Sequence, residues 1–165
     1  MSEFNFNSQV CTDRNQSERL IALGIKPETA DMVWTHAYYG TWVVTPSETP
    51  LYEESDSVPA WSLGRLIEML PSPIHPKEEL PSFSGCAYLN LAQIAVWYDY
   101  TDYDMDDRTL ISWSGNGFFS AVVNCIEWLI KEGYFNDEYL VNQAEIEEHC
   151  KGVLEYLDYI KGEEE

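Results

Sequence analysis

The clearest hydrophobic pattern in this chain lies between residues 108 and 135, where a short strand, a glycine-rich turn and one apolar helix follow one another. Within 118–131 the polar positions are spaced four, three and four residues apart, which places them on one narrow stripe of a helix. The rest of this helix must be covered by protein. We expect it to be the central helix of a small domain, ended by Gly133 and capped at its start by Ser114 or Asn116.

Shorter patterns before this helix predict three more helices and several strands. Gly24 is typical of a residue that ends a helix, and Pro27 suits the first turn of the next one. Ser57 or Ser62 can cap a third helix, which leads into an extended, proline-rich segment at 71–83. We expect helices at 15–23, 28–37 and 60–70, and strands at 38–45, 86–91, 94–101 and 109–113.

The strand expected at 94–101 alternates between two faces, because successive side chains of a strand point to opposite sides. One face would carry Val96, Tyr98 and Tyr100, and the other Trp97 and Asp99. This strand should form a hairpin with the strand before it, and an acidic turn at 102–107 should connect it with the strand after it.

The C-terminal part predicts a long helix at 138–161. Five apolar residues recur there at steps of four, three, four and three, which is a heptad-like stripe: Ile146, Cys150, Val153, Leu157 and Ile160. The stripe can pack on the core of the domain itself, or it can form the seam of a homodimer.

These elements predict a single α+β domain at 15–161, between a flexible N-terminus at 1–14 and an acidic tail at 162–165. A small antiparallel sheet of three or four strands would pack on the central helix, with the N-terminal helices around it. The C-terminal helical extension at 136–161 would lie across this domain.

Composition adds a strong negative charge. The chain has 165 residues, of which 29 are acidic and 9 are basic, so its formal charge is −20. Such a charge repels nucleic acid and anionic membranes and favours cationic partners. The N-terminal residues lack the basic and apolar regions of a signal peptide, and the four cysteines form no CxxC pair. We therefore expect a cytoplasmic protein with reduced, buried thiols.

Three short segments add a resemblance: TADM at 29–32, PAWSL at 59–63 and EWLI at 127–130. With much of 17–134 around them, they resemble a set of small proteins from gut anaerobic bacteria and from their prophages and mobile elements. No activity is established for that set, so no functional residue transfers to this chain. The resemblance implies a mobile-element setting and an interaction or counter-defence role, and residues 136–165 fall outside it.

The acidic turn is the sharpest candidate site. Its alternating aspartates match positions one, three and five of a calcium loop, but Asp107 and Trp113 stand where that loop needs glycine and glutamate. A solvated hairpin turn explains the same residues, and a weak cation site is the alternative. With the neighbouring tyrosines, the turn forms a candidate interaction surface: Tyr98, Tyr100, Asp102, Tyr103, Asp104, Asp106 and Asp107.

Other candidate chemistry is weak. The three histidines lie far apart in the sequence, and Glu145 with His149 supplies only two of the ligands that a zinc site needs. Ser112 stands where the GxSxG motif around a nucleophile such as Ser114 would have glycine. We therefore predict no catalytic, cofactor or metal residues.

Four functions remain as hypotheses. The first is a non-enzymatic protein-interaction module of prophage or mobile-element origin that binds an unidentified protein. The second is an acidic mimic of nucleic acid that inhibits a DNA-binding protein. The third is a small-ligand or metal-dependent enzyme that uses the acidic segment at 99–107, with Asp99, Asp104 and Asp106 as its working groups. The fourth is a homodimeric structural component built through 146–160.

Overall fold

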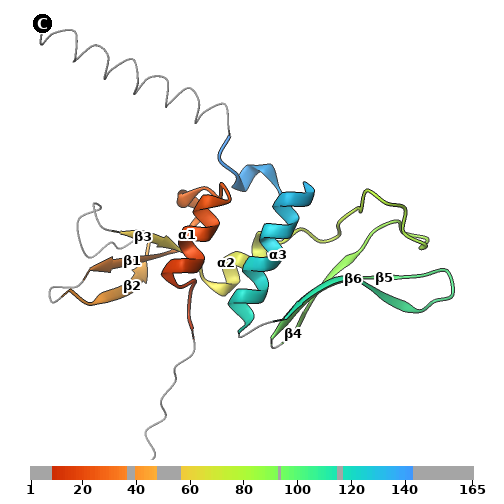
Figure 1. Cartoon of the computed structure of the whole chain (residues 1–165), viewed down its shortest axis with the longest axis horizontal. Coiled ribbons are helices and arrows are strands. Elements are labelled where there is room, and N and C mark those ends of the chain that lie inside the picture. The colour runs from red at the N-terminus through yellow and green to blue at the C-terminus, as the bar shows by residue number, and fades with distance from the viewer. Residues whose placement is uncertain (1–8, 37–39, 48–56, 93, 115–116, 143–165) are drawn as a thin grey trace, which may run out of the picture.

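The computed structural model of the chain describes residues 9–36, 40–47, 57–92, 94–114 and 117–142, and its fold is α+β. Two antiparallel three-stranded sheets lie on either side of a central group of helices (Figure 1). The α+β class is confirmed, whereas the prediction of one sheet is wrong.

The helices are α1 (Arg14–Ala22), α2 (Leu63–Glu68) and α3 (Phe118–Glu132), with 3-10 turns η1 (Pro27–Thr29) and η3 (Asp137–Tyr139). The strands are β1 (Met32–His36), β2 (Trp42–Pro46), β3 (Val58–Ala60), β4 (Tyr88–Ala92), β5 (Ala95–Thr101) and β6 (Asp107–Ser114).

The first sheet has the strand order β2-β1-β3 and corrects the helix predicted at 28–37. Only the single 3-10 turn η1 forms there, and the chain then becomes extended. Trp34 in β1 lies opposite Val44 of β2 and Val58 of β3, so β1 gains ladder hydrogen bonds on both sides. Aromatic and β-branched residues such as Trp34 and Thr35 suit this extended state. The apolar pattern of so short a window fits a helix and a strand about equally well.

The second sheet is the predicted hairpin with one further strand, in the order β4-β5-β6. The predicted alternation along β5 is confirmed. Val96 and Tyr98 are fully buried on the side of the sheet that faces α3, whereas Trp97 and Asp99 between and after them are only half-buried. The hydroxyl of Tyr98 donates a hydrogen bond to the carbonyl oxygen of Pro71 at 2.7 Å, which ties the proline-rich segment to the sheet. The ladder between β5 and β6 shifts register between Tyr98 and Asp99.

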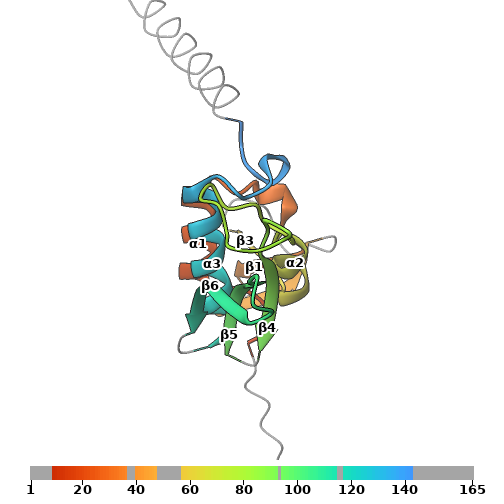
Figure 2. The same cartoon turned by 90° about the vertical axis from the view of Figure 1, so that its right-hand side faces the viewer.

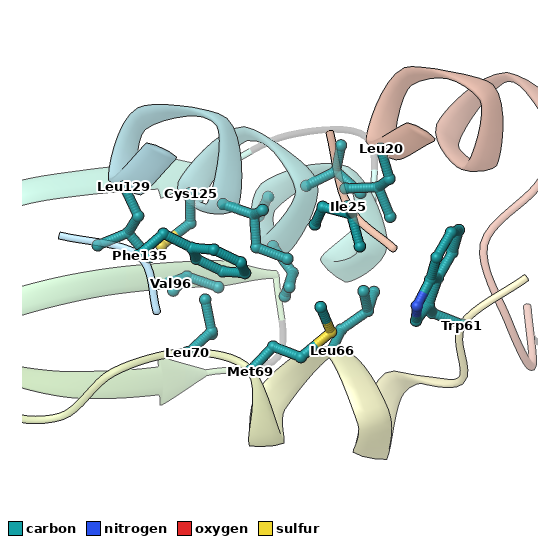
Figure 3. Packing of buried hydrophobic residues seen from close by; sticks show 14 of the residues in the cluster. Leu20, Ile25, Trp61, Leu66, Met69, Leu70, Val96, Cys125, Leu129 and Phe135 are labelled. Atoms are coloured by element: carbon teal, nitrogen blue, oxygen red, sulfur yellow. The ribbon is translucent and has the colours of Figure 1, made fainter. Parts of the chain in front are cut away.

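Helix α3 occupies the centre of the core, as its sequence predicts. Figure 3 shows Cys125 and Leu129 of α3 packed with Val96 of β5 and with Phe135, while Leu66 of α2 and Met69, which follows the end of α2, approach from below. Seven residues of α3 are buried: Phe119, Ala121, Val122, Val123, Cys125, Ile126 and Leu129. This helix therefore joins α2 and the second sheet in one hydrophobic cluster.

The ends of α3 differ in how well they were predicted. Gly133 ends the helix in the left-handed conformation, with φ 74°, as expected. The predicted cap is wrong, because the N-cap is Gly117, a residue without a side chain that could cap the helix. Ser114 is exposed at the end of β6, and Asn116 lies outside the described residues.

The polar stripe of α3 also contacts another helix. The side-chain amide of Gln16 on α1 donates to the hydroxyl of Ser120 at 3.3 Å, and Arg19 of α1 forms an ion pair with Glu127. The stripe that the sequence assigns to solvent is therefore partly covered by α1.

The two shorter helices, α1 and α2, begin and end within three residues of the predicted positions. Asp13 and Gln16 form a capping box at the start of α1, and Gly24 follows its end with φ 88°. Of the two serines considered for α2, Ser62 is the N-cap, and its hydroxyl accepts a hydrogen bond from the amide of Arg65 at 3.2 Å.

The predicted C-terminal helix does not start at residue 138. Residues 137–139 form η3, and Leu140 then pairs with Ile25 in an isolated β-bridge. The amide of Val141 donates to the carbonyl oxygen of Gly24 at 2.8 Å. The rest of that helix, including the candidate dimer seam at 146–160, lies outside the described residues. None of the helices in the described part of the chain is long and apolar enough to cross a membrane.

Candidate functional site

The turn between β5 and β6 is a three-residue hairpin loop. The amide of Asp102 donates to the carbonyl oxygen of Asp106 at 2.9 Å, and the amide of Met105 donates to the carbonyl oxygen of Asp102 at 3.1 Å. Met105 takes the left-handed conformation, with φ 65°, at the position where such loops usually carry glycine. The backbone of the loop is thus fixed by its own hydrogen bonds. At Met105 this backbone is held in a conformation that L residues rarely adopt.

Asp102 organises this loop from within. Its Oδ1 accepts hydrogen bonds from the amides of Asp104 (2.9 Å) and Asp106 (3.0 Å), and its Oδ2 accepts one from Nε of Arg108 (2.8 Å). The bond from Arg108 is the main cause that lowers the pKa of Asp102, and the two amide bonds lower it further. Asp102 is only 8% exposed. This predicted surface residue is therefore a structural residue of the turn.

Three large apolar side chains are exposed around the loop. Phe83 is 80% exposed, Tyr103 57% and Met105 74%. The rings of Phe83 and Tyr103 meet edge to face, with their centroids 4.8 Å apart. The amide of Tyr103 donates to the carbonyl oxygen of Pro81 at 3.1 Å, which holds the proline-rich segment against the hairpin. Single exposed apolar residues are ordinary on protein surfaces, whereas these three belong to one loop and to the segment that packs against it.

Carboxylates surround these apolar groups. Asp104, Asp106 and Asp107 are all exposed. Arg108 is the only basic residue of the segment 102–108, and it pairs with Asp106 at 3.3 Å as well as with Asp102. This segment therefore has four carboxylates against one guanidinium group. We call the exposed set the hairpin-tip surface: Phe83, Tyr103, Asp104, Met105, Asp106 and Asp107.

Figure 1 shows the hairpin reaching away from the helices, with the proline-rich segment beside it, and Figure 2 views this side of the molecule directly. The structure thus brings together residues from two separate parts of the sequence, and the predicted interaction surface changes accordingly. Tyr98 is fully buried and Tyr100 is half-buried, so neither belongs to the exposed surface. Phe83 and Met105 were missed. An isolated aromatic residue within a proline- and serine-rich segment was the available signal for Phe83.

The aspartates proposed for catalysis have different environments. Oδ2 of Asp99 accepts a hydrogen bond from Nε1 of Trp97 at 2.5 Å on the face of β5 opposite Tyr98, whereas Asp104 and Asp106 belong to the turn. Within the described ranges, no three His, Cys, Asp or Glu side chains are grouped so that they could hold a metal ion.

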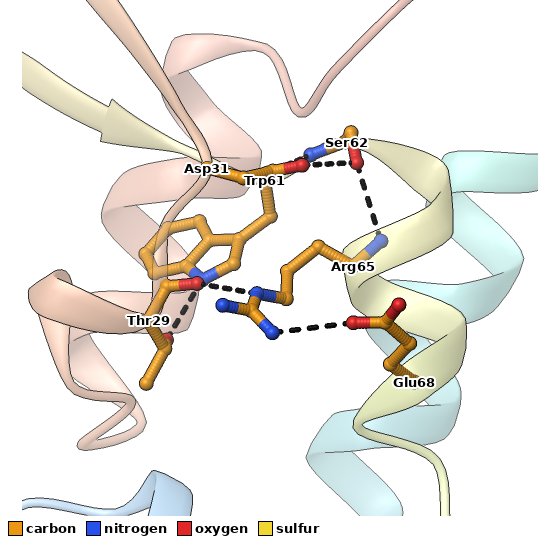
Figure 4. Close-up of polar contacts among 6 residues, drawn as sticks. All are labelled: Thr29, Asp31, Trp61, Ser62, Arg65 and Glu68. Carbon is orange, nitrogen blue, oxygen red and sulfur yellow. Dashed lines mark hydrogen bonds and ion pairs between the residues drawn. The ribbon is translucent and has the colours of Figure 1, made fainter. Parts of the chain in front are cut away.

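A second polar cluster joins the first sheet to α2 and has a structural role (Figure 4). The amide and hydroxyl of Ser62 donate to the carboxylate of Asp31 at 2.8 and 2.5 Å. Nε1 of buried Trp61 donates to the hydroxyl of Thr29 at 2.9 Å, and Nε of Arg65 donates to the carbonyl oxygen of Thr29 at 2.9 Å. These partners satisfy one another, so the cluster fixes α2 on the segment that leads into β1.

Two of the described thiols, those of Cys11 and Cys125, are unsuited to nucleophilic chemistry. Cys11, Cys86 and Cys125 are free and buried, as predicted, and Cys150 lies outside the described residues. Burial raises the pKa of Cys125 to about 12. Burial, followed by the nearby carboxylates of Asp31 and Asp13, raises the pKa of Cys11 to about 11. Both thiols are therefore protonated at neutral pH, and the thiolate is the reactive form.

Comparisons of the chain with protein-family models, with curated proteins and with solved structures find no match in any of the three.

Proposed function

We propose that this chain is a non-enzymatic protein-interaction module that contacts its partner through the hairpin-tip surface. The observation that carries the proposal is the exposure of Phe83, Tyr103 and Met105 around a loop that Asp102 holds rigid. The resemblance to proteins of prophages and mobile elements agrees with an interaction role, and a bacterial protein partner would fit such a setting.

The rigidity of the loop matters for affinity. Binding a partner costs free energy because side chains and loops lose conformational freedom. Here the turn is already ordered by hydrogen bonds to both oxygens of Asp102, and a further backbone bond joins Tyr103 to Pro81. Aromatic side chains bury a large area and have few rotatable bonds, so they make efficient anchors of an interface.

The test is an affinity capture from bacterial lysate with the full chain immobilised. Two triple variants are compared with the wild type in this experiment. The tip variant combines Phe83→Ser, Tyr103→Ser and Met105→Ser. The control variant combines Val10→Ser, Ile21→Ser and Ile94→Ser, which removes three exposed apolar side chains elsewhere. Because all six side chains are exposed, both variants should keep the melting temperature of the wild type within a few degrees.

We expect a partner that the wild type and the control variant retain and that the tip variant loses. Equal retention by all three proteins would contradict the proposed surface.

The charge of −20 supports a second candidate, the acidic mimic of nucleic acid. A mimic would retain a basic DNA-binding protein on the tip variant as well, and added salt would release that protein steeply because exposed charges are screened.

A further inference from the structure

We propose that the hairpin-tip surface binds a polypeptide segment in which arginine side chains flank an apolar residue. This inference rests on the proposed function and specifies the chemistry of the partner.

The orientation of the two aromatic rings favours a cationic partner. The planes of Phe83 and Tyr103 are inclined by 84°, so the edge of one ring meets the face of the other. Both side chains remain more than half exposed, which leaves ring surface free for a partner. The face of an aromatic ring is electron-rich and attracts cations, and arginine is the cation found there most often.

The charge around the rings favours arginine as that cation. Arg108 is already engaged by Asp102 and Asp106, so the segment cannot neutralise its own carboxylates. Asp104 lies within the loop, Asp107 is the first residue of β6 after it, and both are exposed. A guanidinium group can stack on a ring while it donates two hydrogen bonds to a neighbouring carboxylate, whereas a lysine ammonium group acts as a point charge.

Other classes of ligand fit this surface less well. Nucleic acid and acidic peptides would meet like charges at this surface. Both oxygens of Asp102 already accept hydrogen bonds from the turn and from Arg108 of β6, so this carboxylate is a poor ligand for the weak cation site that was the alternative for this turn. An apolar side chain between the arginines would cover Met105, which is otherwise exposed to water.

The experiment is a selection of short random peptides, displayed on phage, against the full-length chain, with counter-selection on the tip variant. The tip variant has the same net charge as the wild type, so the counter-selection removes peptides that bind only because the whole protein is acidic. We expect the remaining peptides to be enriched in arginine over lysine, and in both over aspartate and glutamate, with an apolar residue close to the arginines.

One selected peptide is then synthesised and titrated against two charge variants. The first combines Asp104→Asn, Asp106→Asn and Asp107→Asn at the tip. The second, matched control combines Glu28→Gln, Asp137→Asn and Glu138→Gln at exposed residues of η1 and η3. The tip charge variant should weaken binding by about tenfold, because exposed ion pairs and cation–π contacts each contribute modestly, and the control should change it by less than about twofold.

Three outcomes would overturn the inference. Tip-dependent peptides without an excess of arginine would refute the partner chemistry and leave the proposed function standing. Equal weakening by the two charge variants would show that only the overall charge acts. A selection that yields no tip-dependent peptide would also refute the inference, and the affinity capture described above would then decide the proposed function independently.

Discussion

Both carboxylate oxygens of Asp102 accept hydrogen bonds at the hairpin turn, from the amides of Asp104 and Asp106 and from the guanidinium group of Arg108. A carboxylate that accepts several hydrogen bonds is stabilised in its ionised form, and the lowered pKa of Asp102 reflects this. At the scale of one residue, this side chain explains why the loop around it is ordered although its neighbours are exposed.

The first prediction concerns the pH dependence of stability. In the unfolded chain the pKa of Asp102 has its ordinary value of roughly 4. Because the folded value is lower, the stabilisation by this carboxylate is complete above roughly pH 4 and is lost as the pH falls through the folded pKa. Asp102→Asn should therefore have a lower melting temperature than the wild type at pH 7, and this difference should shrink in strong acid.

Circular dichroism melts at a series of pH values measure this difference. Asp104→Asn, at an exposed neighbour in the same turn, is the matched control and should follow the wild type. A difference between Asp102→Asn and the wild type that stays constant down to the most acidic pH would contradict the assigned role of Asp102.

At the scale of elements, the hairpin places a methionine where glycine would be less strained. Met105 has φ 65°, and the strain of a non-glycine residue in this left-handed region costs about 1 kcal/mol of stability. A glycine there would relieve that strain but would also give the unfolded chain more freedom, which costs about 0.5–1 kcal/mol. The two effects nearly cancel, so stability alone gives no reason for a methionine at this position.

The second prediction follows from this balance. Met105→Gly should leave the free energy of unfolding within about 1 kcal/mol of the wild-type value, as measured by urea denaturation. It should nevertheless weaken partner binding, because the variant lacks an apolar side chain that is 74% exposed in the free protein. Met105→Leu keeps both the strain and the apolar surface and should bind like the wild type. A large loss of stability in Met105→Gly would show that this side chain packs in the folded protein.

At the scale of the whole molecule, the formal charge of −20 acts against the compact state. Like charges are closer together in the folded protein than in the unfolded chain, so their repulsion lowers stability. The core resists this repulsion through a cluster that joins α1, α2, α3 and the second sheet. Trp61 of this cluster directly follows β3 of the first sheet and donates a hydrogen bond to Thr29 of η1, the turn that precedes β1.

The third prediction is that sodium chloride raises the melting temperature. Most of the rise should occur below roughly 0.15 M, where the Debye length falls to about 8 Å. The control variant with Glu28→Gln, Asp137→Asn and Glu138→Gln has three fewer negative charges and should respond less. Calorimetry of both proteins across a salt series measures the effect, and a melting temperature that falls with salt would refute it.

The sequence by itself determined the features that depend on neighbouring residues. Helix α3 follows from the spacing of its polar positions, its end follows from Gly133, and the two faces of β5 follow from alternation. The α+β class and the buried cysteines Cys11, Cys86 and Cys125 were also predicted correctly. These signals are local. The periodicity of a helix or a strand, and a glycine that ends a helix, can be read from consecutive residues.

The tertiary structure decided what depends on partners distant in the sequence. Trp34 is in a strand because Val44 and Val58 lie on either side of it, and no local pattern contains that information. The same holds for the hairpin-tip surface, where Phe83 meets Tyr103 from another segment while Tyr98 is buried in the core. Local propensity is weak compared with strand pairing and burial. Whether a short apolar segment becomes a helix or a strand therefore depends on the strands that pair with it. Whether a side chain is buried or exposed depends on the segments that pack against it.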